Sequence, residues 1–86
     1  GSEVNLALDK YQTAKAKTEF YAKQVASLET AVRSTQLLMK HGNTTYLEVL
    51  TAQTTLLNAR LNQVSNKFVE IQGMIELYRS LGGGQD

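Results

Sequence analysis

The sequence predicts an all-α protein: an antiparallel two-helix coiled-coil hairpin that associates into a larger helical bundle. Three observations support this prediction. Proline is absent from the 86 residues, and proline is the residue that most strongly interrupts a helix. Apolar residues recur at alternating intervals of three and four in both halves of the chain, which is the heptad pattern of coiled coils. A break containing glycine separates the two halves.

The first long helix is expected over residues 3–41. Its heptad positions are apolar except for two threonines, which predicts one continuous contact face along the helix. These positions are Ala7, Tyr11, Ala14, Thr18, Tyr21, Val25, Leu28, Val32, Thr35 and Met39. We interpret residues 1–2 as a cloning remnant and leave them out of the argument.

Residues 42–45 are expected to form the hairpin turn. Gly42 suits the left-handed conformation that follows a helix end. Thr45 and Glu48 have the spacing of a capping box, in which the hydroxyl and the carboxylate cover free amides at the start of a helix. Because so short a connection leaves no room for a parallel return, the two helices must run antiparallel.

The second long helix is expected over residues 46–81, and only Thr54 interrupts its main apolar stripe. That stripe is Leu47, Leu50, Thr54, Leu57, Leu61, Val64, Phe68, Ile71, Ile75 and Tyr78. We expect it to pack against the first helix. Three glycines follow Leu81, and their high backbone entropy disfavours helix, so residues 82–86 are expected to form a flexible tail.

The second helix carries another apolar stripe near the turn, formed by Val49, Ala52, Leu56 and Ala59. No charged residue lies between Val49 and Ala59. A lone hairpin that left this surface in water would forgo roughly 25 cal/mol per Å² of apolar area. We therefore expect these four residues to pack laterally against neighbouring hairpins, and we expect the isolated chain to self-associate.

Composition argues against several classes of function. The chain has no cysteine and one histidine, so neither a thiolate nucleophile nor a histidine-based triad or metal cluster can be built. Its net charge of +1 comes without a basic block, which argues against nucleic acid as a partner. The carboxylates are spaced singly rather than paired for acid–base work. We predict no enzymatic activity, no cofactor and no metal.

Two long sequence patterns are the most specific features of the chain. Residues 41–64 read HGNTTYLEVLTAQTTLLNARLNQV, and residues 75–84 read IELYRSLGGG. Both are similar to the C-terminal periplasmic helical hairpin of the TolC-like outer-membrane efflux family, whose terminal pattern is LYxALGGG. Residues 24–42 resemble the helix that enters the turn in that family. The resemblance covers about residues 20–84.

This resemblance implies a role in a trimeric export conduit of the Gram-negative cell envelope. In the family, an outer-membrane β-barrel continues into a periplasmic α-barrel made of helical hairpins. The hairpin turns meet the hairpin tips of a membrane-fusion (adaptor) protein, which links the conduit to an inner-membrane pump. The chain would then be one tip-bearing hairpin, with neighbouring hairpins of the homotrimer as lateral partners. The residues expected to dock the adaptor are His41, Gly42, Asn43, Thr44, Thr45, Tyr46 and Leu47.

The sequence departs from the family pattern at two positions. Many members have an acidic residue where Thr51 stands, and some have arginine where Thr44 stands. A closing latch built from those charges cannot form in this chain. The alternative interpretation is a stand-alone coiled-coil oligomerisation module with no transport role, in which the turn would have no function.

Overall fold

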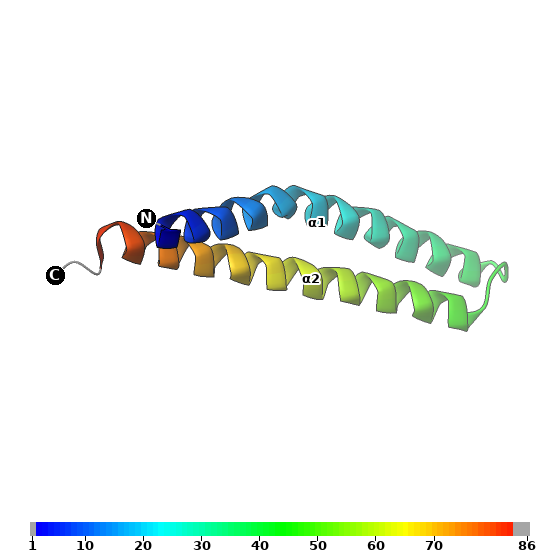
Figure 1. Cartoon of the computed structure of the whole chain (residues 1–86). Coiled ribbons are helices and arrows are strands. Elements are labelled where there is room, and N and C mark those ends of the chain that lie inside the picture. Colours follow the sequence, from blue (N-terminus) through cyan, green and yellow to red (C-terminus); the bar gives the residue numbers. More distant parts are fainter. Residues whose placement is uncertain (1, 84–86) are drawn as a thin grey trace.

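A computed structural model describes residues 2–83, and its two long helices lie side by side as an antiparallel hairpin (Figure 1). Helix α1 spans Ser2–Lys40 and helix α2 spans Tyr46–Tyr78. A π-helical segment, η1, continues α2 over Arg79–Gly83. The hairpin is a rod of 66 × 16 × 14 Å. The predicted all-α hairpin is confirmed, and no strand occurs within the described residues.

Helix α1 ends in a hydrogen-bonded cap centred on Gly42. The Asn43 N–H donates to the Leu38 carbonyl at 2.8 Å, and the Gly42 N–H donates to the Met39 carbonyl at 3.0 Å. This pair of bonds is the Schellman motif, which satisfies the last carbonyls of a helix. It requires the left-handed conformation at Gly42, whose φ is 75°. The prediction for Gly42 is confirmed.

Helix α2 begins with half of the predicted capping box. The Thr45 hydroxyl accepts a hydrogen bond from the Glu48 N–H at 3.4 Å, as expected for an N-cap. The Glu48 carboxylate does not return to the backbone. It accepts a hydrogen bond from the Thr44 hydroxyl instead. Glu48 still places negative charge at the positive end of the α2 dipole, which stabilises the helix start.

The end of α2 differs from the expected tail. Regular α-helix ends at Tyr78, but the chain stays helical through Gly82 and Gly83 in η1. The Ser80 hydroxyl helps to hold this segment by donating to the Glu76 carbonyl at 2.9 Å. The glycines therefore mark the loss of α-helical geometry rather than the loss of helix. Residues 84–86 of the predicted tail lie outside the described residues.

The two helices meet along faces that are rich in small residues. The contact face of α1 is the predicted heptad face, and its buried residues are Ala7, Ala14, Val25 and Val32. The buried residues of α2 are Val49, Leu56, Ala59, Glu70 and Gly73. They lie on a run with heptad spacing, at positions 49, 52, 56, 59, 63, 66, 70, 73, 77 and 80, which we call the inner stripe of α2.

The main apolar stripe of α2 lies on the outside of the hairpin, contrary to prediction. We call it the outer stripe: Leu47, Leu50, Thr54, Leu57, Leu61, Val64, Phe68, Ile71, Ile75 and Tyr78. Its apolar side chains are between 43% and 72% exposed. Inner and outer stripes are two residues apart in sequence, which is about 200° around a helix, so they occupy opposite faces. The prediction was wrong because it assigned the contact face of α2 to the stripe with the largest apolar side chains.

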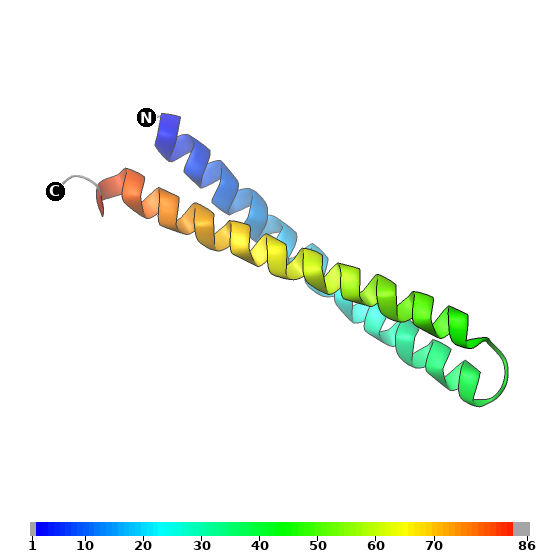
Figure 2. The ribbon, with the colours of Figure 1, turned by 90° about the horizontal axis from the view of Figure 1, so that it is seen from below.

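Small residues on the inner stripe allow the helix backbones to approach closely. A Cβ atom on Gly73 would lie 2.9 Å from the Tyr11 backbone nitrogen and 3.0 Å from the Tyr11 Cα. Toward the middle of the rod, larger side chains such as Tyr21 and Leu28 occupy the contact face of α1. Helix α1 bows away from α2 there (Figure 1). Seen from below, the two helices cross over one another (Figure 2).

The apolar core lies in the half of the rod nearer the turn. Val25 and Val32 of α1 pack with Leu56 and Ala59 of α2. Leu28 and Ala52 pack against this cluster and are partly buried. In the other half of the rod, small and polar residues share the contact between the helices with the half-buried apolar side chains of Val4, Leu8 and Leu77. The inner stripe of α2 is therefore more polar in the half nearer the termini than in the half nearer the turn.

Candidate functional site

The turn presents exposed side chains on a backbone that is fixed from both sides. The Schellman motif closes α1, and the Thr45 N-cap opens α2. Six of the seven predicted docking residues are exposed, namely His41, Gly42, Asn43, Thr45, Tyr46 and Leu47. Thr44 is half-buried, and its hydroxyl donates a hydrogen bond to the Glu48 carboxylate. The fold thus brings all seven together at the end of the rod opposite the termini (Figure 1).

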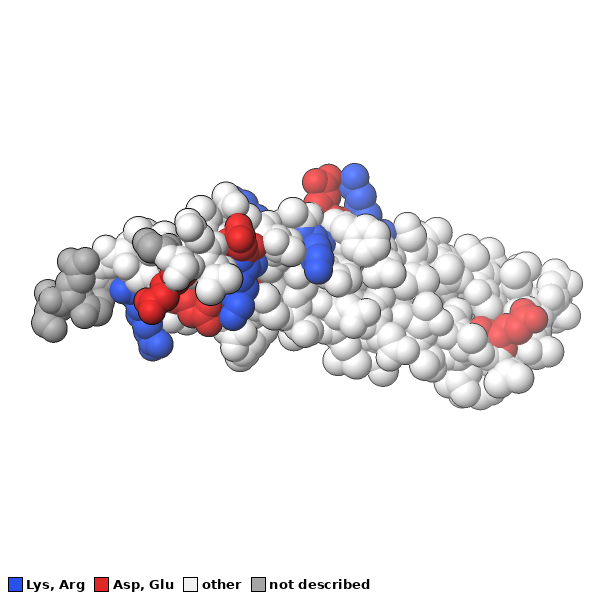
Figure 3. Space-filling model, in the orientation of Figure 1, with Lys and Arg blue, Asp and Glu red and all other residues white. Residues whose placement is uncertain are grey.

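Large apolar side chains gather around this tip. Tyr46 and Leu47 are 65% and 69% exposed. The last turn of α1 adds Leu37, Leu38 and Met39, which are also exposed. Glu48 is the only charged residue between Lys40 and Arg60 in the sequence. In the face shown in Figure 3, charged side chains accordingly gather away from the tip, apart from one acidic spot close to it.

The four residues predicted to pack against neighbouring hairpins lie inside the hairpin instead. Val49, Leu56 and Ala59 are 4%, 8% and 3% exposed, and Ala52 is half-buried. They face α1, where they contribute to the apolar core. Their role in lateral packing is therefore corrected: these residues hold the two helices together. The surplus apolar surface of α2 is the outer stripe.

The half of the rod nearer the termini is held by polar contacts that sequence reasoning missed. Glu70 is 8% exposed, and its carboxylate accepts a hydrogen bond from the Thr18 hydroxyl at 3.2 Å. Lys67 pairs with the same carboxylate at 3.5 Å. The Asn66 side-chain amide donates to the Ala14 carbonyl at 2.8 Å. Continuing the inner stripe beyond Ala59 with heptad spacing would have reached both Asn66 and Glu70.

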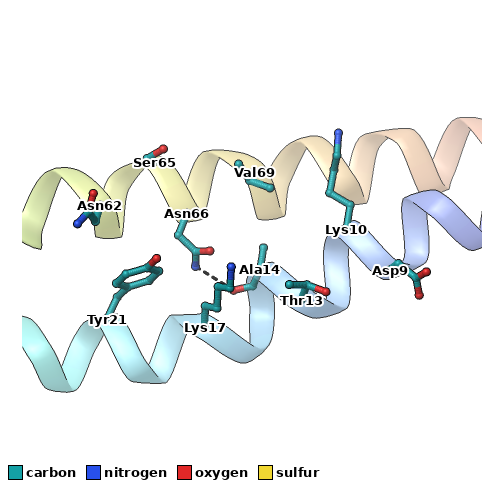
Figure 4. Close-up of a pocket in the computed structure, with 10 residues that line it drawn as sticks. All are labelled: Asp9, Lys10, Thr13, Ala14, Lys17, Tyr21, Asn62, Ser65, Asn66 and Val69. Carbon is teal, nitrogen blue, oxygen red and sulfur yellow. Dashed lines mark hydrogen bonds between the residues drawn. The ribbon is translucent and has the colours of Figure 1, made fainter.

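A groove between the two helices surrounds this amide contact (Figure 4). It is lined by α1 residues between 9 and 21 and by α2 residues between 62 and 69. Two of its polar side chains link the helices, since the Asn66 amide donates to the Ala14 carbonyl and Lys10 pairs with Glu76 at 3.1 Å. A second exposed ion pair, between Arg60 and Glu29 at 2.8 Å, also links the helices. Exposed pairs of this kind contribute little to stability.

Within residues 2–83, neither a metal-ion site nor a membrane-spanning helix is found. No group of three or more carboxylate or imidazole side chains in this range is placed to hold a metal ion. No helix in the same range combines the length and the apolar character needed to cross a membrane. The described residues form a rod of 66 × 16 × 14 Å whose tip is exposed and weakly charged.

Comparison with known proteins identifies one family. The family model described as outer membrane efflux protein matches residues 1–83. No curated protein and no solved structure gave a match. The matched range includes both helices, the turn and η1, and it contains most of the residues that carry the resemblance to TolC-like proteins. The chain belongs to the outer membrane efflux protein family.

Proposed function

We propose that the chain is the periplasmic tip hairpin of an outer-membrane efflux channel, and that residues 41–47 dock the hairpin tip of a membrane-fusion adaptor protein in a tripartite export pump. The observation that carries this proposal is the turn, whose backbone is fixed while its side chains are exposed. Family membership supports the channel role, because the family consists of efflux channels rather than enzymes. The complete channel would be a homotrimer in the Gram-negative cell envelope.

The tip has the properties that docking between two hairpins requires. A turn that is already ordered loses little conformational entropy on binding. Tyr46 is of a residue type that is enriched among those that dominate interface energetics, and Leu47 adds exposed apolar area beside it. Nothing lies within 4 Å of the place where a Cβ on Gly42 would sit, so the backbone of a partner can approach the turn closely.

The proposed mechanism is mechanical and includes no chemical step. Packed helices can slide past one another by small shear movements, and opening of the conduit would use such movements of α1 against α2. Thr44 and Thr51 stand where some members of the family have charged residues that form a closing latch. Closure in this protein would therefore depend on other contacts. If the chain is part of a channel, its turn has a docking function. If it is a stand-alone oligomerisation module, the turn has none.

Gly42→Val tests the turn. Valine is strained at a φ of 75°, so the turn must rearrange, while the core around Val25 and Leu56 stays in place. We expect binding to the purified helical hairpin of the cognate adaptor to fall at least tenfold, that is by about 1.4 kcal/mol or more. Biolayer interferometry measures the binding, and circular dichroism should show nearly unchanged helix content. Unchanged binding would remove the turn from the contact surface.

Leu47→Ala provides a second variant with a matched control at the other end of the rod. Leu47 and Leu6 are both 69% exposed, but only Leu47 lies at the tip. We expect Leu47→Ala to weaken adaptor binding about tenfold and Leu6→Ala to leave it unchanged. Equal losses would mean that the adaptor contacts apolar surface along the rod without preference for the tip. No loss from any variant would favour the stand-alone module.

A further inference from the structure

A small polar cluster joins the two helices in the half of the rod away from the turn. The Asn66 side-chain amide donates to the Ala14 carbonyl at 2.8 Å, and this bond runs obliquely between the helices (Figure 4). The Thr18 hydroxyl donates to the Glu70 carboxylate at 3.2 Å and also reaches the Ala14 carbonyl at 3.2 Å. Each helix therefore contributes two residues, one turn apart, to the cluster.

The two hydrogen bonds between the helices cross one another. In an antiparallel pair, a step forward along α1 matches an equal step back along α2. Starting from the contact of Gly73 with the Tyr11 backbone, the pairs of directly opposite residues are Tyr11 and Gly73, Ala14 and Glu70, and Thr18 and Asn66. The observed bonds instead join Ala14 to Asn66 and Thr18 to Glu70. They lean in opposite directions along the rod, so sliding of one helix in either direction lengthens one of them.

We infer that this cluster is a register lock, a contact that holds α1 at one axial position against α2, with Asn66 and Glu70 as its positioning residues. One residue of helix corresponds to about 1.5 Å along the axis. A hydrogen bond is lost once its donor and acceptor are more than roughly 3.5 Å apart. A slide of one or two residues is therefore enough to break one of the two bonds.

The turn does not by itself fix the axial position this far along the rod. About 36 Å of helix separates Thr18 from Gly42 at 1.5 Å per residue. Between them α1 bows away from α2 (Figure 1), and a bowed helix can change its span by straightening or by bending further. The two exposed ion pairs between the helices join long side chains, which can follow such a movement.

Register specificity explains why polar residues occupy these contact positions. Glu70 is 8% exposed and Asn66 is half-buried, and apolar residues in place of buried polar or ionic ones are often neutral or stabilising. A polar residue at a contact position of a coiled coil fixes the register at a cost in stability. No buried side-chain nitrogen or oxygen in residues 2–83 lacks a hydrogen-bond partner, so the observed register satisfies the whole cluster.

Shear of α1 against α2, which the proposed function uses for opening, would have to release the register lock. This consequence rests on the proposed function. The lock itself is a property of the hairpin and is tested on the 86-residue chain alone, without adaptor or channel.

Double electron–electron resonance measures the axial position, because the chain has no cysteine and accepts spin labels at two introduced cysteines. Asn5→Cys and Gln53→Cys place the labels at exposed positions of α1 and α2, about 40 Å apart along the rod. Movement of the free end of α1 toward the turn shortens the distance between the labels, and movement away from the turn lengthens it. We expect one narrow distance distribution when the cluster is intact.

Removing the two bonds one at a time should shift this distance in opposite directions. Thr18→Val leaves the Asn66 bond, which draws Ala14 toward the turn and shortens the distance. Asn66→Leu leaves the Glu70 bond, which draws Thr18 away from the turn and lengthens the distance. We expect each shift to be about 1.5–3 Å, or one to two residues of helix, with the helix content measured by circular dichroism unchanged.

Gln63→Leu is the matched control for Asn66→Leu. Gln63 is also half-buried on the inner stripe, but no hydrogen bond joins it to α1 within the described residues. Glu70→Gln keeps an oxygen that accepts from Thr18 and should retain the original distance. A broad distribution with the cluster intact, an unchanged distance in either Thr18→Val or Asn66→Leu, shifts in the same direction, or an equal shift in Gln63→Leu would each overturn the register lock.

Discussion

Gly73 shows how one missing side chain sets the distance between the two helices. The nearest atoms to an added Cβ belong to the Tyr11 backbone, at 2.9 and 3.0 Å, and backbone cannot rotate aside as a side chain can. Gly73→Ala should therefore push the helices apart at this point. We expect a loss of about 1–3 kcal/mol in the free energy of unfolding, measured by urea denaturation followed by circular dichroism.

Gly82→Ala is the control for this substitution. No atom lies within 4 Å of a Cβ at Gly82, and alanine generally favours helix over glycine by about 1 kcal/mol. The control should be as stable as the wild-type chain or slightly more so. If Gly73→Ala were equally well tolerated, the close approach of the backbones at Tyr11 would be disproved.

The structural role of Gly42 can be predicted from the sequence, whereas that of Gly73 cannot. Gly42 could be predicted because it sits where the heptad pattern stops, next to the polar residues of a turn. Gly73 lies within an uninterrupted heptad pattern, where it resembles a minor weakness in a helix. Its role depends on Tyr11, which is 62 positions away in the sequence, and local spacing does not reveal which residue of α1 faces it.

At the scale of the helices, sequence spacing predicts the elements and the turn but not the contact face of α2. Helix α1 has one stripe with heptad spacing, and that stripe is the observed contact. Helix α2 has two stripes with heptad spacing on opposite faces, and apolar periodicity favours the outer one, because the inner stripe continues beyond Ala59 with Gln63, Asn66 and Glu70. The structure selects the stripe with Ala52, Ala59 and Gly73, since small residues permit close approach. The larger residues remain outside, which also explains why the predicted lateral residues are buried.

The hydrogen bond between Thr18 and Glu70 should help to hold the two helices together. Thr18→Val keeps the side-chain shape but removes the hydroxyl that donates to the Glu70 carboxylate. Because Glu70 is 8% exposed, water replaces this bond poorly. We expect a loss of about 1–2 kcal/mol in the free energy of unfolding, measured by thermal or urea denaturation.

Thr55→Val is the matched control for Thr18→Val. The Thr55 hydroxyl donates only to the Thr51 carbonyl within α2, at 3.0 Å, and the Thr18 hydroxyl makes the same kind of bond to Ala14. The difference between the two variants therefore isolates the contact between the helices. Similar stability of the two variants would show that the Thr18–Glu70 bond contributes nothing.

At the scale of the whole molecule, apolar burial is concentrated at one end of the rod. The cluster of Val25, Val32, Leu56 and Ala59 lies in the half nearer the turn, and the large apolar side chains that face the contact in the other half, such as Leu77, are only half-buried. Local opening is easiest where few apolar contacts must be broken. The hairpin should therefore open from its termini while the half nearer the turn stays closed, which would keep the proposed docking surface ordered.

Hydrogen exchange followed by NMR measures this difference directly. We expect the backbone amides of residues 25–32 to exchange at least tenfold more slowly than those of residues 7–14, which corresponds to about 1.4 kcal/mol or more in the free energy of opening. Both segments belong to α1, so the comparison is made within one helix. Slower exchange in residues 7–14 would contradict the prediction, because the polar contacts of Asn66 and Glu70 would then stabilise the rod more than its apolar core does.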